Sequence, residues 1–180
     1  LTVYNEPYVQ PAEPENLDVE GLLKGIYLFQ QGPKQRKKVA QILASGVGMN
    51  WALKAAKLLE SDWGVSASVW SVTSWNELRR DGLAVDRHNF LNPSDQRTAY
   101  VAHKLRNAEG PVIAVSDYMR AVQDQIAPWV SQDFVSLGTD GFGLSDTRGA
   151  LRRHFKVDAE SIVVATLAEL AKAGDVKESV

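Results

Sequence analysis

The stretch KVAQILASGVGMNWALKAAKLLESDWG, residues 38–64, contains one complete strand-and-helix unit. It opens with a short apolar run that favours a strand and is interrupted by Ser45 and Gly46. From Met49 to Leu59, apolar residues recur every three or four positions, which predicts a helix with one buried face. We expect Ser45 or Gly46 to begin this helix and Gly64 to end it.

The alternation of strand and helix continues along the chain. Strands are expected at Gly25–Gln30, Lys38–Ala44, Ala67–Thr73, Val112–Val115 and Phe134–Leu137. Further helices are expected at Trp75–Phe90, Arg97–Arg106, between Ser116 and Pro128, at Thr147–Phe155 and between Asp158 and Gly174. Ser116 and Asp117 are expected to supply the N-terminal cap of the helix that ends before Pro128. Strands that alternate with helices need crossover connections, which produce a mostly parallel sheet covered on both faces. The predicted fold class is therefore α/β, a three-layer α/β/α arrangement around about five strands.

The first residues differ in composition from the rest. Asn5–Asn16 holds three prolines and three glutamates, so it can neither complete a sheet ladder nor continue as a helix. We expect residues 1–18 to be an extended linker from a preceding domain and residues 19–180 to be a single α/β domain, a usual domain size. Because the chain opens at Leu1 without an initiator methionine, we expect it to be a piece of a longer protein.

Composition excludes several classes of function. The net charge is −2 with both signs mixed, so no basic stripe predicts nucleic-acid binding. No apolar run approaches the ~20 residues that a membrane-spanning helix needs. The absence of cysteine excludes disulfides, thiolate nucleophiles and cysteine-ligated metals, and it is compatible with a cytoplasmic location.

The glycine-rich stretch FVSLGTDGFGLSDTR, residues 134–148, has the composition of a ligand loop. It lacks the lysine of a phosphate-binding P-loop and the acidic ladder of a calcium loop. The favoured interpretation is a tight turn that needs positive φ, in which Asp140 and Asp146 accept hydrogen bonds from backbone amides. Ser145 or Asp146 is expected to cap the next helix, and Phe142 is a candidate contact residue. A contact surface or a ligand site remains the alternative.

Other candidate motifs are weaker. Residues 45–48, SGVG, resemble the start of a dinucleotide fingerprint, but Trp51 stands where a third glycine or an alanine is required. Asp117 follows a strand as a phospho-acceptor aspartate would, yet the acidic metal ligands of such a site are missing. The histidines at 88, 103 and 154 lie far apart in sequence, with no metal-ligand spacing.

An aromatic residue lies among charges at residues 71–82, SVTSWNELRRDG. On a helix, Trp75 could anchor an interface, although a solvated helix with internal ion pairs is the stronger interpretation. The candidate interface residues are therefore Trp75, Asp140, Phe142, Ser145 and Asp146, and no catalytic, cofactor-binding or metal-binding residue is predicted.

Several stretches together resemble one family. They are NEPYVQPAEPE and DVEGLLKGIY within residues 5–27, ILASGVGMNWALKAAKLLESDWGV at 42–65, SVTSWNELRRDG at 71–82, VSDYM at 115–119 and LGTDGFGLSDTRGALRRHF at 137–155. The chain is similar throughout to the carboxy-terminal domain of homodimeric bacterial pyruvate dehydrogenase E1 components of the actinobacterial type. These are transketolase-like enzymes that depend on thiamine diphosphate.

The resemblance implies a longer enzyme that decarboxylates pyruvate and reductively acetylates the lipoyl group of the E2 component. It implies that thiamine diphosphate and Mg²⁺ are held by domains outside this chain, so that none is bound by this domain alone and the isolated fragment is inactive. It also implies a mixed sheet whose first strand is antiparallel. The implied partners are a homodimer mate and E2, in the cytoplasm, and the implied roles of this domain are structure, dimerisation and complex assembly.

An alternative is a stand-alone α/β domain that binds a protein or a small ligand. A small ligand would bind in the crevice beyond Ser45 and Ser116, where the strand order is expected to reverse.

Overall fold

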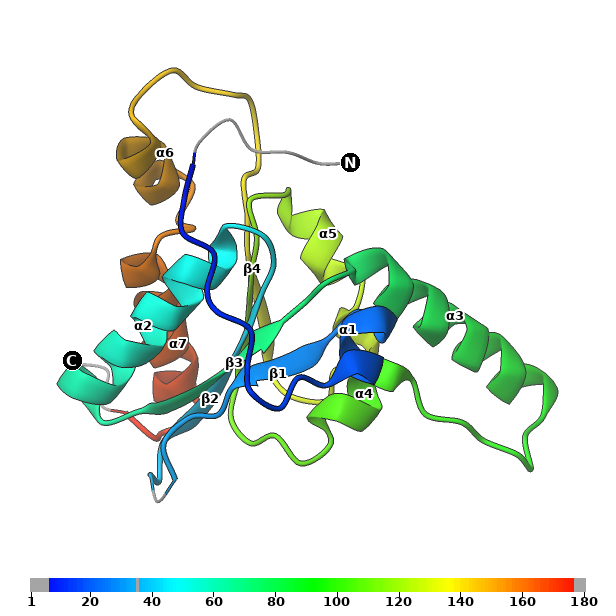
Figure 1. The fold of residues 1–180 in the computed structure, drawn as a ribbon. Helices are drawn as coiled ribbons and strands as arrows, with labels where there is room; N and C mark the ends of the chain where they lie inside the picture. The colour runs from blue at the N-terminus through cyan, green and yellow to red at the C-terminus, as the bar shows by residue number, and fades with distance from the viewer. Residues whose placement is uncertain (1–6, 35, 177–180) are drawn as a thin grey trace.

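The structure, a computed structural model, describes residues 7–34 and 36–176 and is built around one five-stranded sheet (Figure 1). The strands run in the order β1-β3-β2-β4-β5. Their bounds are β1 Tyr27–Gln30, β2 Val39–Ala44, β3 Ser66–Ser71, β4 Val112–Val115 and β5 Phe134–Leu137. The pair β1–β3 is antiparallel and the other pairs are parallel, which confirms the mixed sheet and the antiparallel first strand.

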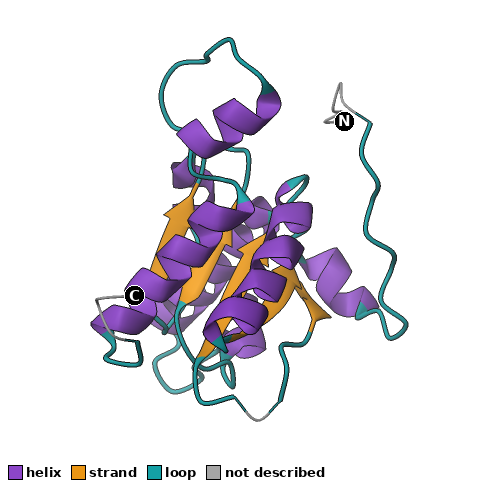
Figure 2. Ribbon diagram, turned by 90° about the vertical axis from the view of Figure 1, so that its left-hand side faces the viewer, coloured by secondary structure: helices purple, strands orange, loops and turns teal. Residues whose placement is uncertain are grey.

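Helices cover both faces of this sheet (Figure 2). The helices are α1 Val19–Lys24, α2 Gly48–Trp63, α3 Trp75–Leu91, α4 Tyr100–Leu105, α5 Arg120–Asp124, α6 Arg148–His154 and α7 Ala159–Lys172, with a 3₁₀ turn η1 at Ala127–Trp129. Helices α2 and α7 pack on one face, and α3, α4 and α5 lie on the other. The three-layer α/β/α prediction is therefore confirmed, while α6 lies beyond the carboxyl edge of the sheet (Figure 1).

The central strand β2 is buried on both faces because its side chains alternate. Ile42 and Ala44 contribute to the core under α2 and α7, whereas Leu43 contributes to the core under α3 and α4. Small residues on α2, including Ala52 and Ala55, are fully buried and let the helix approach the strands closely. This packing explains why the strand-and-helix unit at residues 38–64 decides the fold.

Two helix starts differ from the sequence prediction. The cap position of α2 is Val47, with no side-chain hydrogen bond, so neither Ser45 nor Gly46 caps it. The cap position of α5 is Met119, because the Ser116 hydroxyl accepts from the nearby amide of Tyr118 instead of capping the helix. In both cases the serine after the strand turns toward the crevice of the sheet.

Helix α1 was absent from the sequence prediction because its six residues are too few to show a helical period. Asp18 caps it and accepts a hydrogen bond of 2.9 Å from the amide of Gly21. Gly25 ends it at φ 106, a left-handed conformation that glycine adopts without steric cost. The Asp18 carboxylate also contacts the ammonium group of Lys104, and the hydrogen bond from Lys104 lowers the pKa of Asp18.

We expect the stabilisation provided by Asp18 to depend on pH. Because the pKa of Asp18 is lowered in the folded state, its contribution is complete above the ordinary aspartate pKa of about 4 and is lost as the pH falls through the lower folded value. The Asp18 side chain is 34% exposed, so solvent screening limits the cost of Asp18→Asn at pH 7 to about 1 kcal/mol or less. Urea unfolding should show that this cost shrinks by pH 3. A cost that is independent of pH would contradict the ion pair.

Gly82 of α3 tests the packing of the second face. A Cβ at this position would lie 2.4 Å from the indole ring of Trp129, so Gly82→Ala should destabilise the chain by about 1–3 kcal/mol despite the better helix propensity of alanine. Gly149 of α6 is the matched control, because a Cβ there meets nothing within 4 Å, and Gly149→Ala should be neutral or slightly stabilising. Urea unfolding of both variants measures the difference, and equal effects would contradict the close contact.

Candidate functional site

The carboxyl ends of β2 and β4 meet at the point where the strand order reverses. Ala44 is paired with Val115, and the chain leaves β2 toward α2 on one face but leaves β4 toward α5 on the other. A crevice at such a reversal is where open α/β sheets usually bind ligands. The predicted position of the crevice, beyond Ser45 and Ser116, is confirmed.

Hydrogen-bonded side chains bridge this crevice. The Ser45 hydroxyl donates to the Ser116 hydroxyl at 2.8 Å, and the indole nitrogen of Trp75 donates to the Ser45 hydroxyl at 3.0 Å. The Ser116 hydroxyl also accepts from the amide of Tyr118 at 3.2 Å. All three bridging side chains are buried, so the network satisfies polar groups that would otherwise be costly inside the domain.

One pocket lies on each side of the bridged serines. The α6-side pocket, of about 270 Å³, is lined by Tyr8, Val47, Gly48, Trp51, Val115, Ser116, Asp117, Thr139, Arg148, Leu151, Arg152, Phe155 and Val157. The α3-side pocket, of about 680 Å³, is lined by Tyr8, Gln10, Ser45, Gly46, Met49, residues 71–76, Tyr118 and Val122. Tyr8 therefore belongs to both pockets, and the linker passes between them.

The α6-side pocket has mainly apolar walls with a few polar groups. The guanidinium of Arg152 lies 5.0 Å from the centre of the Trp51 ring, in cation–π geometry. The indole nitrogen of Trp51 is buried and has no hydrogen-bond partner among the described residues. Asp117, Arg148 and Arg152 are its charged residues, but no histidine lines it. This pocket can hold a partly apolar group, yet it contains no histidine base that could activate a serine.

The glycine-rich loop lies beside this pocket and is fixed at its base. The amide of Thr139 donates to the carbonyl of Tyr118 at 2.9 Å, and the amide of Arg120 donates to Asp140 at 2.9 Å. A Cβ on Gly138 would lie 2.5 Å from the carbonyl oxygen of Tyr118, so the two segments touch through their backbones. Of the three glycines in the loop, only Gly141 has positive φ.

The candidate interface residues of the glycine-rich loop differ in their hydrogen bonds. Phe142 is 92% exposed, and the side chains of Asp140 and Asp146 accept from the amides of Arg120 and Thr147, as the sequence interpretation proposed. Ser145 is exposed and does not cap α6.

Two of the sequence expectations are wrong in detail. The cap of α6 is Thr147, not Ser145 or Asp146, and its hydroxyl accepts from the amide of Ala150 at 3.3 Å. Trp75 is only 4% exposed and is hydrogen-bonded inside the domain, so its side chain is not a surface anchor. The signal was the spacing of Trp75 and Leu78, three residues apart, which places both on the buried face of α3.

The other candidate residues do not converge. His88 bonds to Asp95 in the loop after α3, whereas His154 lies edge-on against Phe155 with ring centres 5.0 Å apart. Among residues 7–34 and 36–176, no group of three or more histidine or acidic side chains is placed to hold a metal ion. Within the same residues, no helix has both the length and the apolar content to cross a membrane.

Sequence reasoning missed two contributors to the crevice. Tyr8 was assigned only to the linker, and its place in both pockets depends on a chain path that no local pattern encodes. The stacking of Arg152 on Trp51 joins residues from α6 and α2, which are far apart in sequence. The sequence predicts Trp51 only as an apolar residue of the helix at Met49–Leu59 and as the residue that breaks a dinucleotide fingerprint.

Comparison with known proteins gives consistent results. The family described as Transketolase-like TK C-terminal domain matches residues 25–158. The pyruvate dehydrogenase E1 components of Mycolicibacterium smegmatis and Mycobacterium tuberculosis are 61% and 58% identical over 181 residues, which is 100% of this chain. The chain spans only 20% of the length of these relatives.

Solved structures share the fold at lower identity. A transketolase from Leishmania mexicana aligns with a TM-score of 0.59 at 24% identity, covering 88% of this chain and 20% of that chain. An inactive β4 tetramer of a split-gene transketolase aligns with a TM-score of 0.55 at 21% identity, covering 81% of this chain and 42% of that chain. At these identities the likeness concerns the fold alone.

The serine bridge can be tested by removing its centre. Ser45→Ala should destabilise the chain by about 1–3 kcal/mol, because it leaves the buried indole of Trp75 without its acceptor. Ser131→Ala is the control, since Ser131 is exposed and its hydroxyl bonds only to Gln132 among the described residues, and it should change the free energy of unfolding by less than about 0.5 kcal/mol. Urea unfolding and the fluorescence of the tryptophans report the result. A neutral Ser45→Ala would contradict the role of the bridge.

Proposed function

The chain belongs to the transketolase-like TK C-terminal domain family. From this premise we propose that it is the carboxy-terminal part of a pyruvate dehydrogenase E1 component. The observation that carries the proposal is the 61% identity to an actinobacterial E1 component along the whole chain. The transketolases share the fold at a much lower 24% identity, which favours E1 over a transketolase.

The full protein is proposed to decarboxylate pyruvate and to acetylate the lipoyl group of an E2 component reductively, in the cytoplasm. Thiamine diphosphate with Mg²⁺ supplies the chemistry that removes CO₂ from pyruvate. The described residues do not fit this cofactor, because they include no cluster of metal ligands, and the glycine loop has no lysine to bind a diphosphate. We therefore assign cofactor binding and catalysis to the rest of the polypeptide.

For this chain we propose a structural and assembly role. Residues 1–18 serve as the linker and residues 19–180 as one domain that contributes to the contact with a homodimer mate and with E2. The candidate contact residues are those of the glycine loop, Asp140, Phe142, Ser145 and Asp146. Phe142 is the strongest of them, since an aromatic side chain that is 92% exposed gains most from being covered.

The proposal is tested on the full-length polypeptide that contains this chain. With thiamine diphosphate, Mg²⁺ and an artificial electron acceptor, it should release CO₂ from pyruvate, and with a lipoylated E2 domain it should form acetyl-dihydrolipoyl groups. Omitting the cofactor should abolish both reactions. A protein that leaves pyruvate unchanged but transfers ketol groups between sugar phosphates would overturn the E1 assignment in favour of a transketolase.

Calorimetry of the 180-residue chain forms the second arm of the same test. Thiamine diphosphate and Mg²⁺ should produce no heat of binding with this chain, because the described residues provide no diphosphate cradle. The full-length protein serves as the positive control. Micromolar binding by the 180-residue chain would overturn the division of roles between this domain and the rest of the protein.

A further inference from the structure

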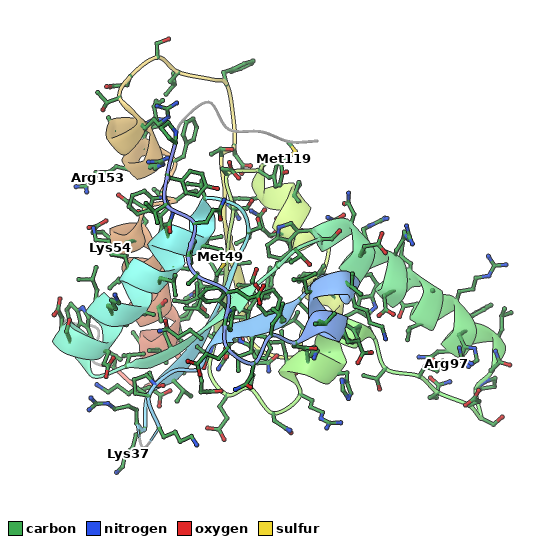
Figure 3. All side chains as sticks on the ribbon, viewed as in Figure 1. Lys37, Met49, Lys54, Arg97, Met119 and Arg153 are labelled. Carbon is green, nitrogen blue, oxygen red and sulfur yellow. The ribbon has the colours of Figure 1, made fainter. Side chains whose placement is uncertain are left out.

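A third pocket lies at the amino edge of the sheet, at the other end of the parallel strands from the crevice described above. Its volume is about 350 Å³, and it lies between the loop from β1 to β2, the first residues of β2 and β3, and the end of α4. Figure 3 shows Lys37 of that loop at the end of the molecule opposite Met119. We call it the amino-edge pocket. Its floor is formed by the strand residues Val39, Gln41, Ser66, Ser68 and Trp70.

The floor of the amino-edge pocket is polar, although parallel strands that are covered on both faces usually carry apolar side chains. Side chains alternate along a strand, so Ser66, Ser68 and Trp70 lie on the same face of β3, which packs toward α3 and α4. Gln41 of β2 lines the pocket with them. Gln41, Ser66 and Ser68 are 6%, 6% and 5% exposed, so each of them needs a hydrogen-bond partner inside the domain.

One of these buried polar side chains lacks such a partner. The indole nitrogen of Trp70 donates to Gln41, and the amide nitrogen of Gln41 donates to the carbonyl of Glu109, both at 2.9 Å. The Ser68 hydroxyl accepts two hydrogen bonds of 3.0 Å from the loop between β1 and β2. The Ser66 hydroxyl forms no hydrogen bond with any described residue. Because buried polar groups in native proteins are nearly always bonded, this hydroxyl is a donor that a ligand in the pocket can use.

The loop that forms one side of the pocket is fixed to the floor. The amide of Gly32 is one of the two donors to Ser68, and the amide of Ser66 donates to the carbonyl of Lys38 at 2.9 Å. A Cβ on Gly32 would lie 2.5 Å from the Ser66 hydroxyl, so the loop backbone rests directly on the start of β3. Both ends of the loop are therefore held, which lowers the entropic cost of binding a ligand beside it.

This loop carries a local excess of positive charge. Residues 34–38, KQRKK, hold four cations in a chain whose charges are otherwise mixed. Lys34 and Arg36 line the pocket, and their side chains form no ion pair or hydrogen bond with any described residue. Lys104 also lines the pocket, although its ammonium group is already paired at the cap of α1. Among the described lining residues, the exposed Glu109 is the one acidic side chain.

We infer that the amino-edge pocket binds a small phosphate monoester. The donors that it offers are the Ser66 hydroxyl, the Lys34 ammonium and the Arg36 guanidinium, and a phosphate dianion has the charge and the three acceptor oxygens to satisfy all of them. Leu28 and Pro33, which also line the pocket, give an apolar wall for the organic part of the ligand. This site goes beyond the proposed function and does not depend on it.

Thiamine diphosphate does not have the chemistry of this ligand. Its thiazolium ring is cationic and would be repelled by the basic loop. Its diphosphate is carried with Mg²⁺, and the described residues hold no cluster of metal ligands. The expectation that the 180-residue chain does not bind this cofactor is therefore unchanged.

Isothermal titration calorimetry of the full-length protein tests the inference. The protein is saturated with thiamine diphosphate and Mg²⁺, which occupies its cofactor site, and is titrated with glycerol 2-phosphate at constant ionic strength. We expect one site per chain that inorganic phosphate also occupies and that glycerol does not. Ser66→Ala should weaken the binding of glycerol 2-phosphate about tenfold, because it removes a hydrogen bond to a charged group. The same substitution should leave urea unfolding unchanged, since the hydroxyl has no partner in the described protein.

Two double variants separate the pocket from the charge of the loop. Lys34→Gln with Arg36→Gln should weaken binding at least about tenfold, because it removes two cations that line the pocket. Lys37→Gln with Lys38→Gln is the matched control, since it removes the same charge from the same loop but neither residue lines the pocket. It should weaken binding less than about threefold, because charges outside the pocket are screened by salt.

Several results would overturn the inference. They are no binding of glycerol 2-phosphate beyond that of glycerol, an unchanged affinity in Ser66→Ala, and easier unfolding of Ser66→Ala in urea, which would mean that the hydroxyl is already bonded inside the domain. Equal losses in the two double variants would mean that the loop attracts anions through its charge alone. Displacement of glycerol 2-phosphate by poly-L-glutamate, with equal losses in both double variants, would assign the loop to an acidic protein surface instead. Pyruvate decarboxylation by the same preparation reports on the proposed function separately.

Discussion

The hydrogen bond between Ser45 and Ser116 joins the carboxyl ends of the two central parallel strands, and the edge of the domain is organised around it. Each serine follows a strand that is buried on both faces and is itself buried, so a hydroxyl without a hydrogen-bond partner would be costly there. The Ser45 hydroxyl donates to the Ser116 hydroxyl and accepts from the indole nitrogen of Trp75 in α3. The bridge occupies the centre of the crevice where an α/β enzyme would place its ligand.

The parts of the fold that the sequence predicts are those with a local signal. The apolar run Val112–Val115 and the periodic stripe of α2 were correctly assigned, because burial on both faces or on one face leaves a pattern in adjacent residues. Helix α1 was missed because six residues give no period, and the cap of α6 was misplaced because Ser145, Asp146 and Thr147 are all good capping residues. Only backbone geometry chooses among them.

The candidate interface residues show where composition misleads. Trp75 and Phe142 are both aromatic residues next to charged or polar ones, and sequence reasoning treated them alike. In the structure one is 4% exposed and the other 92%, because Trp75 begins a helix that packs on the sheet, whereas Phe142 lies in a loop that turns away from it. The exposure of an aromatic side chain in a loop depends on the path of the chain in three dimensions, and the spacing of residues in a loop does not predict that path.

The exposed loops after β4 and β5 and the hydrogen-bonded serines lie at the same carboxyl edge of the sheet. In an α/β domain, the loops at the carboxyl edge usually converge on a ligand. Here the loop after β4 and the loop after β5 are tied to each other at Tyr118 and Thr139, and Met119, Phe142 and Leu144 in these loops are exposed. Tyr8 of the linker lies against both pockets beside the bridge. Backbone and side-chain hydrogen bonds therefore join the bases of the two loops, while the large exposed side chains that the loops carry are apolar.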